Sequence, residues 1–469
     1  MLAIQREYFS ILAKYFSITT GGDISSFKSG SELTIWAREN ARKVAPELSK
    51  ALEWVYPELQ KFYRAHSETI SRAAKRIQGI KVVLGGQSNF GSPQLDSVRQ
   101  MILYVDTVLI ADPVLPWIET ERKEEKFPHV NFMLNVYHLL HLRPFIEKDL
   151  EPMPVYIFQS WEKSLEKIDS TTIGQIKQFT ALVISNKLGL DFTSFEEIME
   201  YGKTHKNKLQ SLIEEKRLFI APEGSLSDNF ELSVKTYKEY IQKWRSAKYL
   251  DGVSNLSDND IALIAIQERL VPQYHLIENA DDLNAHPLTS LPVQWHYYKM
   301  CNTLFSDRLL SEEFLSLRTV AEIEALSTGE FSWLTNISIE SLIELREQRE
   351  NESFRHELHK FTQDLHDSAL QDLDNVGFEV ARGLSSMLRS HQKEIEALKR
   401  KYNLKLFYTG ASVAAAGVIT FEPSLAPWIG DFSPLISLGK FTMDKITDIL
   451  ENRKATHSLI GILSSAKNK

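Results

Sequence analysis

The stretch KVVLGGQSNFGSPQLDSVRQMILYVDTVLIADP, from Lys81 to Pro113, decides the fold. It begins with an apolar, β-branched run that two glycines stop, and it ends with a second such run from Asp106 onward. Between these runs, Ser92 as N-cap and Pro93 as first helical residue predict the start of a helix. Strands without polar alternation are typical of a parallel sheet that is covered on both faces.

Two more apolar runs continue this alternation of strands and helices. A helical pattern through NFMLNVYHLLHLRPFIEKDL leads to PVYIFQS, Pro154 to Ser160, which predicts a third strand. RLFIAPEG, Arg217 to Gly224, predicts a fourth strand after a second helical region. Strands that alternate with helices indicate a small parallel α/β domain, which we place at residues 78–225.

Helical periodicity dominates the rest of the chain. The N-terminus, MLAIQREYFSILAKYF, predicts an amphipathic helix that docks on the body of the protein. SDND, Ser257 to Asp260, has the residues of a capping box that opens a helix, with Pro272 shortly beyond it. The polar, proline-bearing stretch from Asn279 to Pro292 predicts a loop.

The C-terminal part of the chain has two distinct sections. Apolar residues from Phe354 to Met387 recur every three or four positions with charges between them, which predicts long amphipathic helices that need partner helices. Residues 406–439 are almost free of charge. Their longest uncharged run, Leu406 to Phe421, is shorter than the roughly 20 residues that cross a bilayer.

These patterns predict a mainly α protein with an embedded small parallel α/β domain. A chain of 469 residues has room for several folding units. The predicted units are a helical N-terminal segment, the α/β domain, a helical domain, and long amphipathic helices with the apolar segment, at residues 1–77, 78–225, 226–336 and 337–469.

Composition narrows the function classes. The net charge of −8 argues against an extensive nucleic-acid surface, because such a surface must carry excess cations. The single cysteine, Cys301, excludes a disulfide framework or a thiolate zinc site within one chain, and its apolar surroundings predict a buried, inert thiol. The N-terminus lacks the pattern of a secretion signal, so a cytoplasmic location is expected.

The glycine-rich loop after the first strand is the candidate ligand site. Gly85, Gly86, Ser88 and Asn89 stand between a strand and a helix, where backbone N–H groups can hold a ligand. Parallel sheets bind ligands at such carboxyl ends. The loop matches neither GxGxxG nor GxxxxGK[ST], so the cofactor is unknown. The alternative is a tight turn that needs glycine for its backbone angles.

A second candidate site is acidic. Asp112 ends a predicted strand, and Glu119 and Glu121 follow it, as in a metal-dependent hydrolase acting on a nucleotide or nucleic acid. Arg122 and Lys123 are interleaved with these acids, so the same pattern also fits a solvated helix face. No GxSxG motif or Ser–His–Asp set can be assembled.

Histidines and the apolar segment leave further alternatives. His138 and His141 share one helix face, and His359 and His366 share another, but neither pair brings a third ligand, so no metal site is assigned. Residues 406–439 are either buried core or a membrane-perturbing segment, and membrane contact is expected only there.

Two resemblances bear on these alternatives. Residues 80–112 resemble the strand–GG–helix–strand segment of cobalamin-binding domains, although the three-cysteine motif and DxHxxG of the radical enzymes that carry them are absent, so only a βαβ shape is implied. ADPVLPWIETER, LLHLRPFIEKDL and IFQSWEKSLE, within 111–166, resemble segments of uncharacterised bacterial proteins, some associated with phage defence. That resemblance implies a bacterial cytoplasmic protein.

The function expected from these patterns is non-enzymatic sensing or interaction. The α/β domain would bind a ligand or partner, and the helical half would assemble with a protein partner or with further copies of the chain. Two alternatives stay open: the hydrolase through Asp112, and the membrane-perturbing effector through 406–439.

Overall fold

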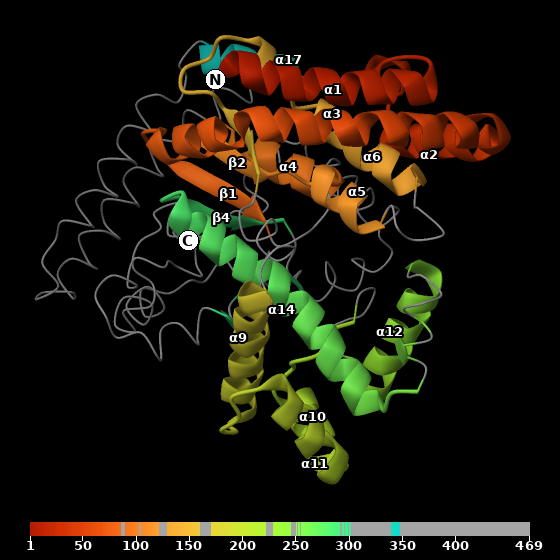
Figure 1. The fold of residues 1–469 in the computed structure, drawn as a ribbon, viewed down its shortest axis with the longest axis vertical. Coiled ribbons are helices and arrows are strands. Elements are labelled where there is room, and N and C mark those ends of the chain that lie inside the picture. Colours follow the sequence, from red (N-terminus) through yellow and green to blue (C-terminus); the bar gives the residue numbers. More distant parts are fainter. Residues whose placement is uncertain are drawn as a thin grey trace, which may run out of the picture. The chain divides into compact units, whose positions relative to one another are not determined.

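The computed structural model consists mainly of helices and contains a small sheet (Figure 1). This confirms a mainly α protein with an embedded small parallel α/β domain. The residues that it describes are 1–85, 90–102, 105–121, 129–159, 170–221, 228–244, 339–347 and, between 250 and 301, all except 251, 254, 291–292, 295 and 299.

The elements alternate in the way that the sequence predicts for its first half. The strands are β1 (Lys81–Gly85), β2 (Thr107–Ala111), β3 (Val155–Phe158) and β4 (His286–Thr289). The helices are α1 (Leu2–Thr20), η1 (Ile24–Ser26), α2 (Gly30–Glu39), α3 (Ala41–Arg76), α4 (Ser92–Met101), α5 (Leu115–Glu121), α6 (His129–Leu140), α7 (Arg143–Glu147), α9 (Ser170–Leu188), α10 (Phe195–Thr204), α11 (Lys206–Glu215), α12 (Phe230–Trp244), α14 (Asp258–Asp282) and α17 (Ile339–Glu347). The helix after β1 begins one residue earlier than predicted, because Gly91 rather than Ser92 is its N-cap.

The chain divides into two compact units. The first comprises residues 1–164, 278–290 and 331–360, and the second comprises the remaining residues. The sheet and its covering helices belong to the first unit. That unit therefore draws on residues from all four segments predicted from the sequence, since β4 and α17 come from 226–336 and 337–469.

The described residues form one sheet of four parallel strands in the order β3-β2-β1-β4. Val82 of β1 lies opposite Val108 of β2, which lies opposite Val155 of β3. On the other side of β1, Gly85 lies opposite Thr289 of β4. The first three strands are the ones that the apolar runs predict, and their side chains are buried on both faces.

The fourth strand is not where the sequence predicts it. Residues 217–221 are not in a strand, and β4 lies instead within Asn279–Pro292, which the sequence predicts to be a loop. The capping box of Ser257 and Asp260 is confirmed, since each backbone N–H donates to the other side chain at 3.2 Å. The helix that it opens runs on through Pro272 to Asp282, ten residues farther than that proline suggests.

The segment 217–221 is buried without being a strand. Side chains from one helical stretch supply its hydrogen bonds: the Tyr297 hydroxyl donates to the Leu218 carbonyl at 3.1 Å and accepts from the Ile220 N–H at 3.0 Å. His296 Nε2 lies 2.9 Å from the carbonyl oxygen of Arg217. The apolar run therefore indicates the burial of residues 218–221 correctly. Its backbone, however, pairs with side chains and, through the N–H groups of Arg217 and Leu218, with carbonyls of α11 rather than with a neighbouring strand.

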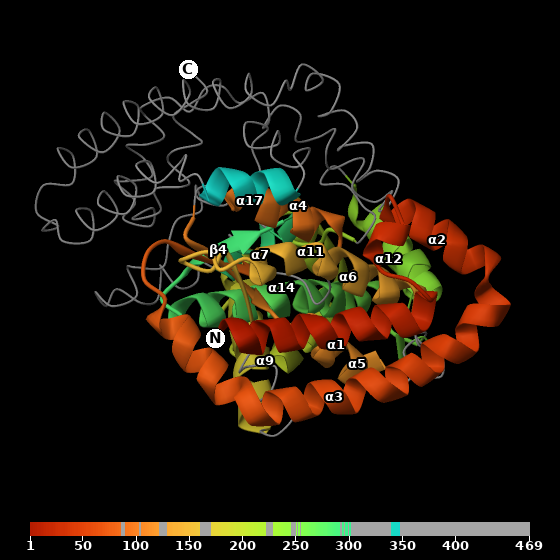
Figure 2. The ribbon, with the colours of Figure 1, turned by 90° about the horizontal axis from the view of Figure 1, so that it is seen from above.

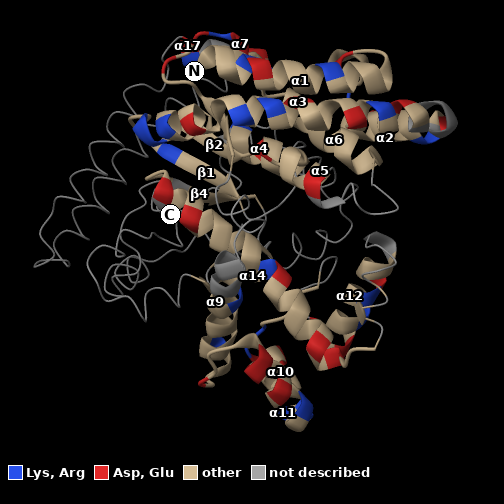
Figure 3. Ribbon diagram, in the orientation of Figure 1, with Lys and Arg blue, Asp and Glu red and all other residues tan. Residues whose placement is uncertain are grey.

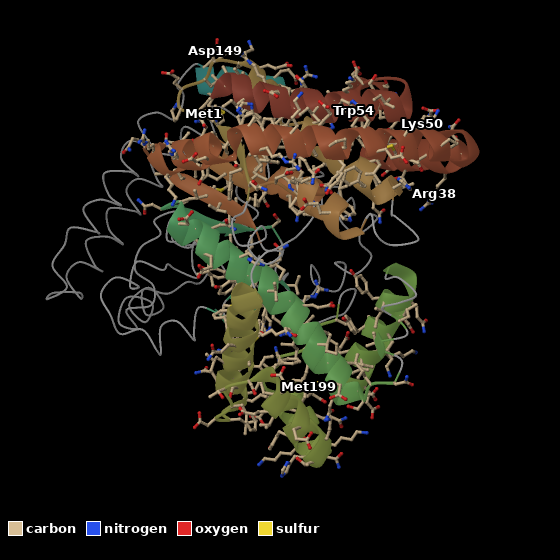
Figure 4. The ribbon with its side chains drawn as sticks, viewed as in Figure 1. Met1, Arg38, Lys50, Trp54, Asp149 and Met199 are labelled. Carbon is tan, nitrogen blue, oxygen red and sulfur yellow. The ribbon has the colours of Figure 1, made fainter. Side chains whose placement is uncertain are left out.

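The N-terminal helix docks on the first unit, as its periodicity predicts. Its buried face is Gln5, Tyr8, Phe9, Ile11, Leu12, Tyr15, Phe16 and Thr19. Helix α1 runs beside α3 in both ribbon views, and α4 and α17 lie on the opposite side of β4 in the second (Figures 1 and 2). Arg6 donates to Asp149 at 3.1 Å, and Lys14 lies 4.4 Å from the ring centre of Trp54 (Asp149 and Trp54 are labelled in Figure 4).

Gln5 closes one edge of the sheet. Its side-chain amide donates to the Ile157 carbonyl and accepts from the Ile157 N–H, both at 2.9 Å. Strand β3 is an edge strand, so these two backbone groups face away from β2 and have no strand partner. The fully buried amide of Gln5 takes the place of a neighbouring strand at this position.

Lys81 joins two helix ends to the start of β1. Its buried ammonium donates to the carbonyl oxygens of Ala74 and Lys75, both at 3.2 Å, and of Leu283 at 2.7 Å. The first two carbonyls belong to the last turn of α3, and the third follows α14. Helix C-termini favour a cation, so the contact suits this position, although burial lowers the pKa of Lys81.

Charges on the outer helices are mixed rather than segregated. Figure 3 shows acidic and basic residues interleaved along α3, and the ion pairs Lys50–Glu47 and Arg72–Glu68 lie there. None of the helices in the described part of the chain combines the length and apolar character needed to cross a bilayer. The apolar segment 406–439 and the long helices predicted beyond residue 347 lie outside the described residues.

Candidate ligand-binding site

The strand order places a topological reversal at β1. The chain passes from β1 to β2 to β3 in one direction, and then adds β4 on the other side of β1. In open parallel sheets, ligands bind outside the carboxyl ends of the strands at such a reversal. Here the reversal lies between β1 and β4, whose last residues are the paired Gly85 and Thr289.

The predicted ligand loop leaves β1 at this reversal. Gly85 is the last residue of β1, and Gly86, Ser88 and Asn89 lie outside the described residues. The structure therefore places the start of the predicted loop beside β4, a neighbour that the sequence does not reveal. Sequence reasoning missed Thr289 and its strand, because HPLT lacks the continuous apolar character of a predicted strand.

Asn135 fixes the far end of the loop. Phe90 is buried, and its backbone N–H donates to Asn135 Oδ1 at 2.6 Å. Asn135 Nδ2 lies 3.5 Å from the carbonyl oxygen of Pro113, in the segment that follows β2. The Gly91 N–H donates to the Gln94 side chain at 2.8 Å. Both ends of the loop are thus held, and Asn135 ties the segments after β1 and β2 together.

The sequence indicates that Asn135 is unusual, but it does not indicate what Asn135 contacts. It is the buried one of two asparagines on α6, a mostly apolar helix, and its side chain is 3% exposed. A buried amide must find hydrogen-bond partners, so such a residue indicates contact with a loop or a strand edge. Only the structure shows that the partner is the backbone of the candidate loop.

Asp112 is fully engaged by its own surroundings. It follows β2, and its backbone N–H donates to the Phe158 carbonyl at 2.7 Å. Its carboxylate accepts from the Tyr8 hydroxyl at 2.6 Å and from the N–H groups of Val114 and Leu115 at 2.8 and 3.3 Å. These contacts cap the start of α5 and satisfy both oxygens.

Burial shifts the pKa values of Asp112, Tyr8 and Tyr63. Asp112 is 2% exposed, and burial raises the pKa of its carboxyl while the Tyr8 hydrogen bond lowers it. Burial and the neighbouring carboxyl raise the pKa of Tyr8. The Tyr63 hydroxyl is buried outside hydrogen-bond geometry, yet it is close enough to Asp112 for their pKa values to affect each other. A metal or substrate would have to displace these partners, which favours a structural role for Asp112.

The structure places the two glutamates on the helix that follows Asp112. Glu119 and Glu121 lie on α5, Glu119 is half-buried, and the side chain of Glu121 is outside the described residues. In the described ranges, no three side chains of His, Cys, Asp or Glu are grouped in a way that could hold a metal ion. Cys301 is buried, and burial raises the pKa of its thiol.

The histidine pair lies on α6 and directly after it. His138 is 7% exposed, and a Cβ added at Gly30 of α2 would lie 3.1 Å from its Nε2. The backbone of α2 is therefore packed against the His138 ring. Burial, and secondarily His141, lowers the pKa of His138 to about 4. The pair His359 and His366 lies outside the described residues.

We expect His138 to make folding sensitive to mild acid. The unfolded chain, with an ordinary histidine pKa of 6.5, binds a proton before the folded chain does. The stabilisation is therefore fully present above pH 6.5 and is lost as the pH falls towards 4. Between pH 7 and pH 5 the loss should be about 2 kcal/mol, measured by urea unfolding as the difference between the wild type and His138→Gln.

The comparison with His138→Gln matters because Asp96 acts in the opposite direction. Burial raises the pKa of Asp96 to about 6. Protonation of this carboxyl therefore increases the stability of the folded state as the pH falls. His205, which is exposed, supplies the matched control, and His205→Gln should follow the wild type. Equal acid sensitivity of the wild type and His138→Gln would contradict this assignment.

Comparison of the chain with known protein families, with curated proteins and with solved structures gives no match.

Proposed function

We propose that the chain is a non-enzymatic sensing protein whose α/β unit binds a small ligand at the carboxyl ends of β1 and β4. The observation that carries this proposal is the reversal of strand order at β1. The glycine loop leaves β1 at that reversal, and Asn135 holds its other end. The two described ends of the loop are held in place before a ligand binds, which favours affinity.

The chemistry of the loop suggests the kind of ligand. Residues 85–91, GGQSNFG, contain neither acid nor base. Recognition would rely on backbone N–H groups, side-chain amides and one hydroxyl, without a fixed charge. These groups suit a small polar molecule that both donates and accepts hydrogen bonds.

We also propose a cellular role for ligand binding. The long amphipathic pattern from Phe354 to Met387 supports assembly with a protein partner or with further copies of the chain. The resemblance within residues 111–166 supports a role in a bacterial cell's defence against phage. On this proposal, the ligand is a molecule whose concentration changes during infection.

Native mass spectrometry of the protein purified from its own host tests the ligand site. We expect a bound small molecule, with occupancy that changes after phage infection. Asn135→Leu should weaken its binding by about tenfold or more, because the Phe90 N–H loses its partner and the loop loses its anchor. Circular dichroism would confirm that the variant is folded.

Asn259 offers a matched control in the second unit. It is equally buried, and its amide donates to the backbone carbonyls of Gly202 and Lys206. Asn259→Leu therefore removes a comparable contact without touching the candidate loop, and should keep the ligand. A protein that carries no small molecule under any condition, or an Asn135→Leu variant with unchanged occupancy, would refute the proposed site.

A further inference from the structure

Helix α17 is a short element that depends on its docking. It has nine residues, and Ile339, Leu342, Ile343 and Arg346 are buried. A helix of this length does not persist alone in water, because the cost of nucleation is not recovered. Helix α17 is therefore expected to unfold when it loses its contacts with the rest of the first unit.

Arg346 is the centre of this docking. Its guanidinium donates to the carbonyl oxygens of Ile102, of Val105 at 2.9 Å, of Asp106 at 2.7 Å and of Pro152 at 3.4 Å. The first is the C-cap of α4, the next two lead into β2, and the last precedes β3. The fixed fork of N–H donors in arginine matches several carbonyls at once, and a helix C-terminus favours a cation.

Helix α4 links this contact to the candidate loop. It begins after Gly91, next to the anchored Phe90, and ends at the carbonyl that Arg346 holds. Its Arg99 also interacts electrostatically with Glu340 of α17. Figure 2 shows α4 and α17 on the same side of the sheet. Helix α4 is therefore preceded by the anchored Phe90 and followed, at its C-cap, by the carbonyl that Arg346 contacts.

We propose that α17 is a releasable clasp on the α/β unit, and that α4 couples the state of this clasp to the anchored backbone of Phe90. Hydrogen bonds are short-ranged, so a displacement of α4 along its axis weakens the bond between Arg346 and the Ile102 carbonyl. Release of α17 in turn removes the Arg346 partner of that carbonyl at the end of α4. Coupling of this kind is reciprocal. Its meaning as a signal rests on the proposed ligand site, but the coupling itself needs no ligand.

An ion pair beside the clasp allows its closure to be measured. Lys148 Nζ lies 3.5 Å from Glu347 Oε1, and both side chains are accessible. A carbodiimide joins such a pair without a spacer, so the yield of the Lys148–Glu347 cross-link reports the docked fraction. Hydrogen exchange of the full chain measures the backbone of residues 90–102 and 339–347 at the same time.

Arg346→Met should open the clasp. We expect exchange of 339–347 to accelerate by about tenfold or more, the cross-link yield to fall, and exchange of 90–102 to rise with it. Glu347→Gln is the matched control, because it removes the exposed ion pair but leaves Arg346, and its exchange should stay as in the wild type. Exchange in α9, in the second unit, should not change, which excludes global unfolding.

The reverse experiment tests the coupling. Asn135→Leu removes the anchor before the start of α4, together with the Pro113 contact, and should also accelerate exchange of 339–347 and lower the cross-link yield. If Arg346→Met leaves both readouts unchanged, α17 is not a clasp. If Asn135→Leu leaves 339–347 unchanged, α4 does not couple the two sites. A failure to find any ligand would overturn the proposed function and would leave these results unaffected.

Discussion

Asp112→Ala is expected to lower the free energy of unfolding by about 3–5 kcal/mol, the largest effect of any change considered for this protein. The Tyr8 hydroxyl and the N–H groups of Val114 and Leu115 would stay buried without an acceptor. Helix α5 would also lose its cap. Urea unfolding at neutral pH, followed by circular dichroism, measures the loss.

Two further variants make this prediction specific. Asp112→Asn should cost less, because the amide oxygen still accepts from Tyr8 while the amide nitrogen opposes an N–H donor. Asp149→Ala is the exposed control: its carboxylate also accepts a hydrogen bond, from Arg6 at 3.1 Å, but it is 81% exposed and should change stability by less than about 0.5 kcal/mol. A stable Asp112→Asn protein that loses a metal-dependent activity would revive the hydrolase alternative.

Gln5→Leu should destabilise the protein by about 2–4 kcal/mol, although leucine is similar in volume and adds apolar surface. The reason is the Ile157 backbone, whose N–H and C=O would be buried beside a hydrocarbon side chain. An opened strand edge also favours pairing between chains. The same urea experiment measures stability, and analytical ultracentrifugation detects new oligomers.

Gln60 provides the control for this substitution. It is a half-buried amide on α3 that donates to the Tyr56 hydroxyl at 2.7 Å, with no strand edge to satisfy. Gln60→Leu should therefore be close to neutral. A Gln5→Leu protein as stable as the wild type would show that water or another group can satisfy the edge of β3, and that the amide is dispensable.

The first three strands were predictable because their apolar composition carries the strand signal, whereas β4, as short as β3, has the mixed sequence HPLT. KVVL, TVLIA and VYIF are continuous apolar runs bounded by glycine, aspartate or proline, and they become β1, β2 and β3. RLFIA carries the same signal and was predicted wrongly, because the Tyr297 hydroxyl and carbonyl groups of α11 pair with its backbone in place of a strand. Hydropathy reports burial, but it does not report which group supplies the hydrogen bonds.

The candidate site was predictable only in part. The sequence places Gly85 and the loop after it at the end of a strand, but the importance of that end depends on β4, which joins β1 across some 200 residues of chain. Asp112 was predicted as a catalytic candidate, and its partner Tyr8 lies 104 residues away. Gly85, Gly86, Ser88 and Asn89 remain predicted ligand residues: the structure places Gly85 at the end of β1, and the other three lie outside the described residues.

The sequence by itself determined which segments are helices and which apolar runs are buried, because periodicity and capping act between residues close in the chain. Tertiary structure alone decided the roles of the buried polar residues Gln5, Lys81, Asn135 and Arg346. Each satisfies backbone groups from another part of the chain, and a polar residue in a helical pattern gives no indication of its distant partner. The physical reason is that burial leaves every N–H and C=O in need of a partner, and only the assembled fold determines which side chain can reach it.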